Sequence, residues 1–160
     1  MEIILVLIIV VLLCYSIGIT LIANYAWNSN KQKCRILEEE NDLFMYWIQK
    51  KMDGQVIKEY LYKNKIETIA FYKFTPICEI LCEELCPYVE IAYCLDENAD
   101  KINEGIEGVP LLKPGEIERG KNVDMLIIAT SIEDERLMKK ARMLKNINTI
   151  KWACEIIKEF

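Results

Sequence analysis

Residues 67–86 read ETIAFYKFTPICEILCEELC, and this stretch decides the fold of the chain. Residues 68–72 are β-branched, apolar or aromatic, which is typical of a buried strand. Thr75 followed by Pro76 is an N-cap with proline in the first helical position, so a helix is expected to begin there. The stretch therefore predicts a strand, a short turn and a helix in direct succession.

Further strands are expected downstream. Residues 123–130, VDMLIIAT, form a nearly continuous apolar run, as in strands buried on both faces of a parallel sheet. Ser131, with Asp134 three residues later, predicts the start of a second helix. The other expected strands are 88–95, 109–112 and 147–152. Strands alternating with helices predict an α/β fold with a parallel sheet of about four or five strands flanked by helices.

The N-terminal part of the chain has a different character. No residue in 3–23 is charged, and at 1.5 Å per residue this run covers the roughly 30 Å apolar layer of a bilayer. The alternative is a cleaved signal peptide, but the chain begins Met1-Glu2 rather than with basic residues and offers no clear cleavage site. We therefore expect a retained transmembrane helix, closed by Tyr25 and Trp27 at the headgroup level.

Charge sets the expected orientation of this anchor. Lys31, Lys33 and Arg35 follow the apolar run, whereas only Glu2 precedes it, so the N-terminus is expected outside the cell membrane and the remaining chain in the cytoplasm. Seven cysteines, an odd number without the spacing of a secreted domain, agree with free cytoplasmic thiols. The net charge of −5 argues against nucleic acid as a partner.

Residues 33–52 contain neither glycine nor proline and carry apolar side chains at helical spacing, which predicts an amphipathic helix. This helix packs on its own domain or binds a protein partner, including a second copy through a short parallel coiled coil. The expected organisation is an anchor at 1–27, an amphipathic linker helix at 28–53 and an α/β domain at 54–160.

The domain resembles the small Rossmann-like nucleotide-sugar-binding domains of bacterial sugar acetyltransferases and of proteins from capsule and exopolysaccharide gene clusters. The first strand and turn of that group look like I-A-I-Y-G-x-G-x-x-G, and residues 69–72, IAFY, match up to the first glycine. Asp96 matches the acidic end of the second strand, and Val123-Asp124 matches the start of the fourth. The resemblance implies a nucleotide or nucleotide-sugar over the first turn and a role in cell-surface polysaccharide biosynthesis.

All three glycines of that pattern are absent, because Lys73, Thr75 and Cys78 stand in their places. Lysine is disfavoured at positive φ, so we expect a turn of different shape. The anion site at the helix N-terminus is weakened, although the helix dipole and the lysine amine could still attract a phosphate. The candidate cofactor-binding residues are Lys73, Phe74, Thr75, Pro76, Ile77, Asp96, Thr130 and Ser131, with Asp96 on the ribose.

The chain lacks histidine and lacks a second group of metal ligands, and both facts limit the catalytic and metal-binding chemistry that it can support. The chain has no histidine, which removes the usual general base and every Ser-His or Cys-His nucleophile pair. Cys78, Cys82 and Cys86 lie four residues apart on one helix face, but without a second group of ligands they are expected in the core and not on a metal. No catalytic residue and no metal ligand is therefore assigned.

The sequence thus predicts a membrane-anchored, non-catalytic Rossmann-like interaction or regulatory module. The alternative is a subunit that binds a nucleotide or nucleotide-sugar, and a complete reductase or epimerase is the least favoured interpretation.

Overall fold

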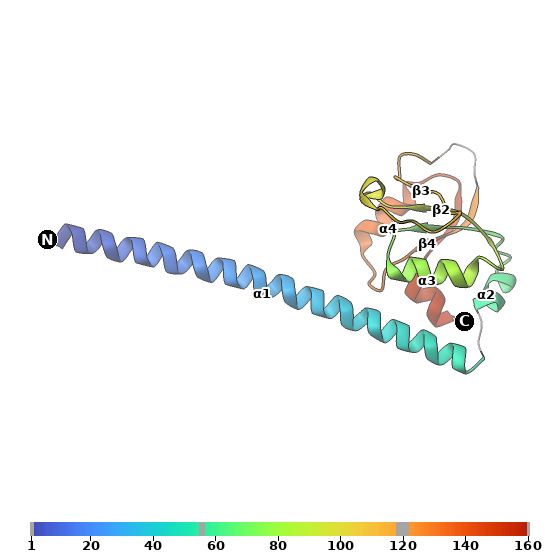
Figure 1. Cartoon of the computed structure of the whole chain (residues 1–160), viewed down its shortest axis with the longest axis horizontal. Coiled ribbons are helices and arrows are strands. Elements are labelled where there is room, and N and C mark those ends of the chain that lie inside the picture. The colour runs from blue at the N-terminus through green and yellow to red at the C-terminus, as the bar shows by residue number, and fades with distance from the viewer. Residues whose placement is uncertain (1, 55–56, 118–121, 160) are drawn as a thin grey trace. The chain divides into compact units, whose positions relative to one another are not determined.

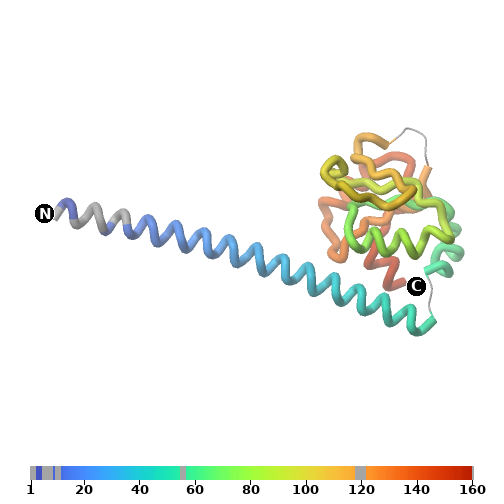
Figure 2. The backbone as a smooth tube through the Cα atoms, viewed as in Figure 1, coloured from blue at the N-terminus to red at the C-terminus, as the bar shows by residue number. Residues whose placement is uncertain are grey.

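The computed structural model describes residues 2–54, 57–117 and 122–159, without the side chains of residues 2, 5–8, 10 and 11. Figure 2 traces the backbone and draws the remaining positions in grey. The chain divides into two compact units, Met1–Glu39 and Glu40–Phe160. Each unit is described by itself.

Helix α1 runs unbroken from Glu2 to Met52 (Figure 1). Its sequence contains no proline, and Gly18 is its only glycine, so nothing in it interrupts the backbone hydrogen bonds. Gly54 follows the helix with φ 76°, the left-handed conformation that commonly ends helices. The expected change from an anchor to a linker helix near residue 27 therefore corresponds to no break in the helix.

Among the residues that the structure describes, no helix combines the length and the apolar character needed to cross a membrane. The span expected at 3–23 includes residues 5–8, 10 and 11, whose side chains lie outside the described part.

The second unit contains a parallel sheet with strand order β3-β2-β1-β4-β5. The strands are β1 (Thr68–Tyr72), β2 (Glu90–Leu95), β3 (Leu111–Leu112), β4 (Val123–Ile128) and β5 (Ile147–Trp152). The helices are α2 (Ile57–Lys63), α3 (Pro76–Leu85), the 3-10 turn η1 (Ala99–Lys101), α4 (Glu135–Arg142) and α5 (Ala153–Glu159). This arrangement confirms an α/β fold with a Rossmann-like parallel sheet flanked by helices.

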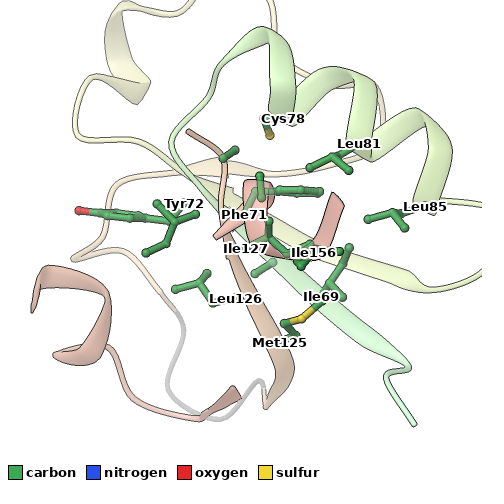
Figure 3. Close-up of a cluster of buried hydrophobic side chains, with 14 of the residues drawn as sticks. Ile69, Phe71, Tyr72, Cys78, Leu81, Leu85, Met125, Leu126, Ile127 and Ile156 are labelled. Atoms are coloured by element: carbon green, nitrogen blue, oxygen red, sulfur yellow. The ribbon is translucent and has the colours of Figure 1, made fainter. Parts of the chain in front are cut away.

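The core lies on both faces of the two central strands. Successive side chains of β1 and β4 point to opposite faces of the sheet, as in any strand. Figure 3 shows Phe71 and Ile127 directed toward α3 and toward Ile156 of α5, whereas Tyr72 and Leu126 are directed to the other face. All five side chains are buried. The central strands are therefore covered on both sides, as the apolar run in β4 indicated.

The C-terminal end of α1 belongs to this core. Leu43 and Trp47 are buried in the same apolar cluster as the sheet, and Phe44 is half-buried against it. Lys51 in the last turn of α1 places its amine 2.8 Å from a carboxylate oxygen of Glu84 on α3. The prediction that this helix packs on its own domain is thus confirmed for part of its surface.

One predicted helix start is wrong. Ser131 was expected to cap the helix after β4, but that helix begins at Glu135 and its N-cap is Asp134, which accepts a hydrogen bond from the backbone N–H of Arg136 (2.8 Å). The chain turns before reaching this cap, because the hydroxyl of Thr130 donates to the carbonyl oxygen of Ile132 (2.9 Å). A carboxylate three residues after a serine can therefore be the cap itself rather than its partner.

Candidate functional site

The carboxyl edge of the sheet holds the predicted binding residues. From β1 the sheet grows outward through β2 and β3, and the chain then returns to place β4 on the other side of β1. Ligands of doubly wound folds bind at such a switch point, outside the carboxyl ends of the strands. Residues 73–77 follow β1, Asp96 follows β2, and Thr130 and Ser131 follow β4, so all of them lie at this edge.

The turn after β1 keeps the conformation that glycine usually supplies. Lys73 has φ 83°, so the expectation of a differently shaped turn is wrong. Its backbone N–H donates to the carbonyl oxygen of Leu95 at 2.7 Å, and this bond holds the residue in place. A non-glycine residue in this region costs about 1 kcal/mol or more, which the surrounding contacts must offset.

Asp96 is the buried polar residue of this edge, with 6% of its surface exposed. Its Oδ2 accepts from the backbone N–H of Phe74 (3.1 Å), and its Oδ1 accepts from the backbone N–H of Asn98 (2.8 Å). The amine of Lys73 lies 3.9 Å from Oδ2. The carboxylate thus joins the end of β2 to the turn after β1, and both of its oxygens already have donors.

Thr75 fills the N-terminus of α3 with its own side chain. Its hydroxyl oxygen accepts from the backbone N–H of Cys78 (3.3 Å), and its proton is donated to the carbonyl oxygen of Ala129 after β4 (2.7 Å). Pro76 has no N–H to offer, and Ile77 is buried. An anion at this helix terminus would have to displace the threonine from the N–H that it caps.

The amine of Lys73 also binds Glu97, which sequence analysis missed. Glu97 lies 3.0 Å from the Lys73 amine through Oε2, while Oε1 lies 2.6 Å from the amine of Lys140 on α4. The phenol of Tyr72 donates to the same Oε1 at 3.3 Å. Glu97 follows the strand-end aspartate and could have been noticed there, but Lys140 is 43 residues away in sequence and no local signal links the two.

These contacts shift the pKa values of the Glu97 carboxyl group and the Tyr72 phenol in opposite directions. Hydrogen bonds from Lys140 and Lys73 lower the pKa of Glu97 to about 2, and burial together with the negative charge of Glu97 raises the pKa of Tyr72 to about 12. At neutral pH the carboxylate is charged and the phenol is protonated. The Tyr72 phenol therefore donates a hydrogen bond and the Glu97 carboxylate accepts it, and neither group gains or loses a proton near pH 7.

Glu97 makes the free energy of unfolding of the domain depend on pH in the acidic range. Because its pKa is lower in the folded chain than the ordinary value of 4.5, its stabilising effect is present above pH 4.5 and is lost as the pH falls toward 2. Glu97 is exposed, so we expect an effect of about 1 kcal/mol or less. Urea unfolding at pH 6 and pH 3 should show a smaller loss for Glu97→Gln than for the unchanged chain. Equal losses in both proteins would contradict the assignment.

A shallow hollow of about 470 Å³ opens beside this cluster. It lies at the carboxyl edge, and two lysine side chains, Lys113 and Lys140, line it together with Tyr72 and Glu97. The remaining lining residues are Pro114, Gly115, Met143 and Leu144. None of the eight predicted binding residues lines the hollow, although Lys73 reaches its wall through Glu97.

Asp124, which the family resemblance singled out, lies at the opposite edge of the sheet. Its Oδ2 accepts from the backbone N–H groups of Glu67 (3.0 Å) and Thr68 (2.9 Å), and its Oδ1 accepts from the side-chain amide of Asn148 (3.3 Å). The aspartate therefore joins the beginnings of three strands. Its role in this chain is structural.

Of the three cysteines expected in the core, two lie on α3, and the expectation is wrong for the third, Cys86, which is the C-cap of that helix. Cys78 and Cys82 are buried and Cys86 is exposed. The sulfur of Cys78 lies 3.7 Å from that of Cys94, and this contact together with burial raises the pKa of the Cys78 thiol. Within the described parts of the chain, no group of three or more His, Cys, Asp or Glu side chains is placed to hold a metal ion.

Comparison with protein-family models, with curated proteins and with solved structures found no match for this chain.

Proposed function

We propose that the chain is a membrane-anchored, non-catalytic Rossmann-like module that binds a protein partner. The observation that carries this proposal is the pairing of the polar groups at the carboxyl edge with one another. Asp96 uses both oxygens on backbone N–H groups, Thr75 occupies the helix N-terminus, and Lys73 is held by carboxylates. A nucleotide would have to break these bonds before forming its own, and each broken bond would reduce its affinity.

The anchor in this proposal is the uncharged run 3–23, with the N-terminus outside and the domain in the cytoplasm. It is supported by the sequence and by the exposure of the described large apolar side chains in the run, such as Ile4, Leu12 and Leu21. Carbonate washing of membranes from cells that produce the full-length chain should leave it in the membrane fraction. Release into the supernatant would contradict the anchor.

The proposed partner surface is the helical segment 33–52, where apolar side chains outside the domain core are exposed. The assignment to cell-surface polysaccharide biosynthesis continues to rest on the family resemblance of the sequence. It would be supported if the chain co-purified with a component of such an assembly system.

A second candidate function is the binding of a nucleotide or nucleotide-sugar without catalysis. The observation that favours it is the hollow beside Glu97, because Lys113 and Lys140 place two positive charges at the carboxyl edge of the sheet. Phosphate groups commonly bind at such edges. In this alternative Lys73 and Lys140 would release Glu97 and turn to the phosphates.

A thermal-shift screen of the full-length chain in detergent separates the two functions. The non-catalytic module predicts no shift with nucleotides, nucleotide-sugars or dinucleotides. A ligand at 100 times its dissociation constant would add about 2.7 kcal/mol to the stability of the folded state. A rise of several degrees that is lost in Lys73→Ala and Lys140→Ala, but kept in a surface control such as Lys145→Ala, would overturn the first proposal in favour of the second.

A further inference from the structure

Helix α1 carries two apolar stripes near its C-terminal end. The first includes Leu43 and Trp47 and is buried in the core of the second unit. The second, which we call the outer stripe, has large apolar side chains whose exposed fractions range from 52% to 77%: Leu37, Met45, Ile48 and Met52. A helix face of this kind costs free energy in water unless something covers it.

We propose that the outer stripe binds the same stripe of a second copy of this chain, with the two α1 helices parallel. This inference rests on the anchor proposed above, because two chains inserted in one membrane with the same orientation present their helices side by side and in parallel. The other possible occupants of the stripe, a different protein or none, are outcomes of the test below.

The heptad pattern of the sequence fits such a pair. With Cys34, Asn41 and Ile48 at the a positions, Leu37 and Phe44 fall at the d positions. Leu37 and Ile48 of the outer stripe thus lie in the seam, and Met45 and Met52 lie at the e positions beside it. Phe44 is half-buried against the domain core, so only part of its side chain faces the seam. These positions form the seam of a parallel coiled coil. A single asparagine at an a position favours one register, since it can pair with its own copy across the seam. Asn41 therefore specifies an aligned, symmetric dimer.

The charges beside the seam are complementary in the same register. Lys33 falls at a g position, and Glu38 falls at the following e position, which in a parallel pair lies opposite the lysine of the other helix. The dimer would contain this ion pair twice. Arg35 and Glu39 pair with each other along one helix, 3.6 Å apart, at the b and f positions that face away from the seam.

The seam is short, and this has a physical consequence. About two heptads bury too little apolar surface to hold two helices together in dilute solution. Anchors that confine both chains to one membrane raise their effective concentration, so a weak seam suffices there. We therefore expect the dimer in the membrane.

Cys34 makes the seam testable with the full-length chain. Cys14 and Cys86 are the other exposed cysteines, so both are replaced by serine to leave Cys34 as the accessible thiol. A short bismaleimide, which alkylates one thiol at each end, is then added to membrane vesicles that contain the chain. Most of the chain should migrate as a covalent dimer, and Cys34→Ser in the same background should abolish the product.

Matched variants test the face of the helix. In the background without Cys34, Asn41→Cys should restore the dimer because it lies on the seam, whereas Asp42→Cys, one residue further along, should not. With Cys34 present, Leu37→Lys should reduce the product about tenfold because it places a charge in the seam. Asp42→Lys, the same kind of change on the outer side, should leave the product unchanged.

The outcomes separate this inference from the anchor on which it rests. If the chain resists carbonate washing but gives no dimer, or gives equal dimer from positions 41 and 42, the seam is wrong and the anchor stands. If carbonate releases the chain although Cys34 still cross-links, the anchor is wrong and the dimer stands. Cross-linking of Cys34 to a different protein in native membranes would replace the second copy by that partner.

Discussion

Asp96→Ala is expected to lower the free energy of unfolding of the domain by about 3 kcal/mol. The carboxylate is buried and accepts two backbone N–H groups, from Phe74 and Asn98, and hydrogen bonds to a charged group contribute about 1.5–3 kcal/mol each. Alanine leaves both donors without their partner. Urea unfolding of the full-length chain in detergent, followed by circular dichroism, measures the loss.

The control for this prediction is Asp100→Ala. Asp100 lies in the same loop region, but its side chain is 57% exposed and its ion pair with Lys113 lies at the surface, so its removal should cost less than about 1 kcal/mol. Asp96→Asn keeps an acceptor oxygen for one of the two N–H groups and should fall between. If Asp96→Ala were as stable as the unchanged chain, the carboxylate would be free for a ligand and the non-catalytic proposal would lose its main support.

Trp47→Ala is expected to cost about 3–5 kcal/mol, the usual range for removing a buried aromatic side chain. The indole is 3% exposed, and it belongs to the cluster that also contains the central strands. Thermal unfolding monitored by circular dichroism should show a clearly lower midpoint. This result would establish that the end of α1 is part of the domain core.

The neighbouring aromatic residue supplies the matched control. Tyr46 is 40% exposed and contacts the amine of Lys50 across its ring face (5.4 Å), so Tyr46→Ala should cost about 1 kcal/mol or less. Trp47→Phe should cost less than Trp47→Ala, because the phenyl ring fills part of the space and the indole N–H has no hydrogen-bond partner in the described part of the chain. Similar midpoints for Trp47→Ala and Tyr46→Ala would show that α1 does not pack on the domain.

The sequence predicted the elements whose signals are local. The strand at 68–72 and the helix cap at Thr75 occur where the pattern placed them, because β-branched residues and an N-cap followed by proline act over a few residues. The cap after β4 was misplaced because Ser131 and Asp134 are both good caps. Only the turn of the backbone at Thr130, which depends on three-dimensional context, selects the second.

The edge of the sheet at which the predicted residues lie could be read from the sequence, but the contacts that these residues make could not. Strand ends can be read from apolar runs, and a switch point follows from the order of strands and helices, so the carboxyl edge could be located from sequence. The pairing of Lys73 and Lys140 through Glu97 could not, since it joins residues from three separate segments. Whether a lysine is available to a phosphate depends on such distant partners, which a single sequence does not reveal.

The core of the second unit contains residues from both ends of that unit in sequence, since Trp47 lies near its beginning and Ile157 near its end. This arrangement has a consequence for synthesis. While the chain is still being made, the segment around Trp47 has emerged long before the residues that bury it exist. The buried cluster that contains this indole also includes Ile156 and Ile157, so it cannot be complete before α5 has been made. A chain that stops before α5 would therefore leave part of this apolar cluster exposed and would be a target for chaperones and proteases.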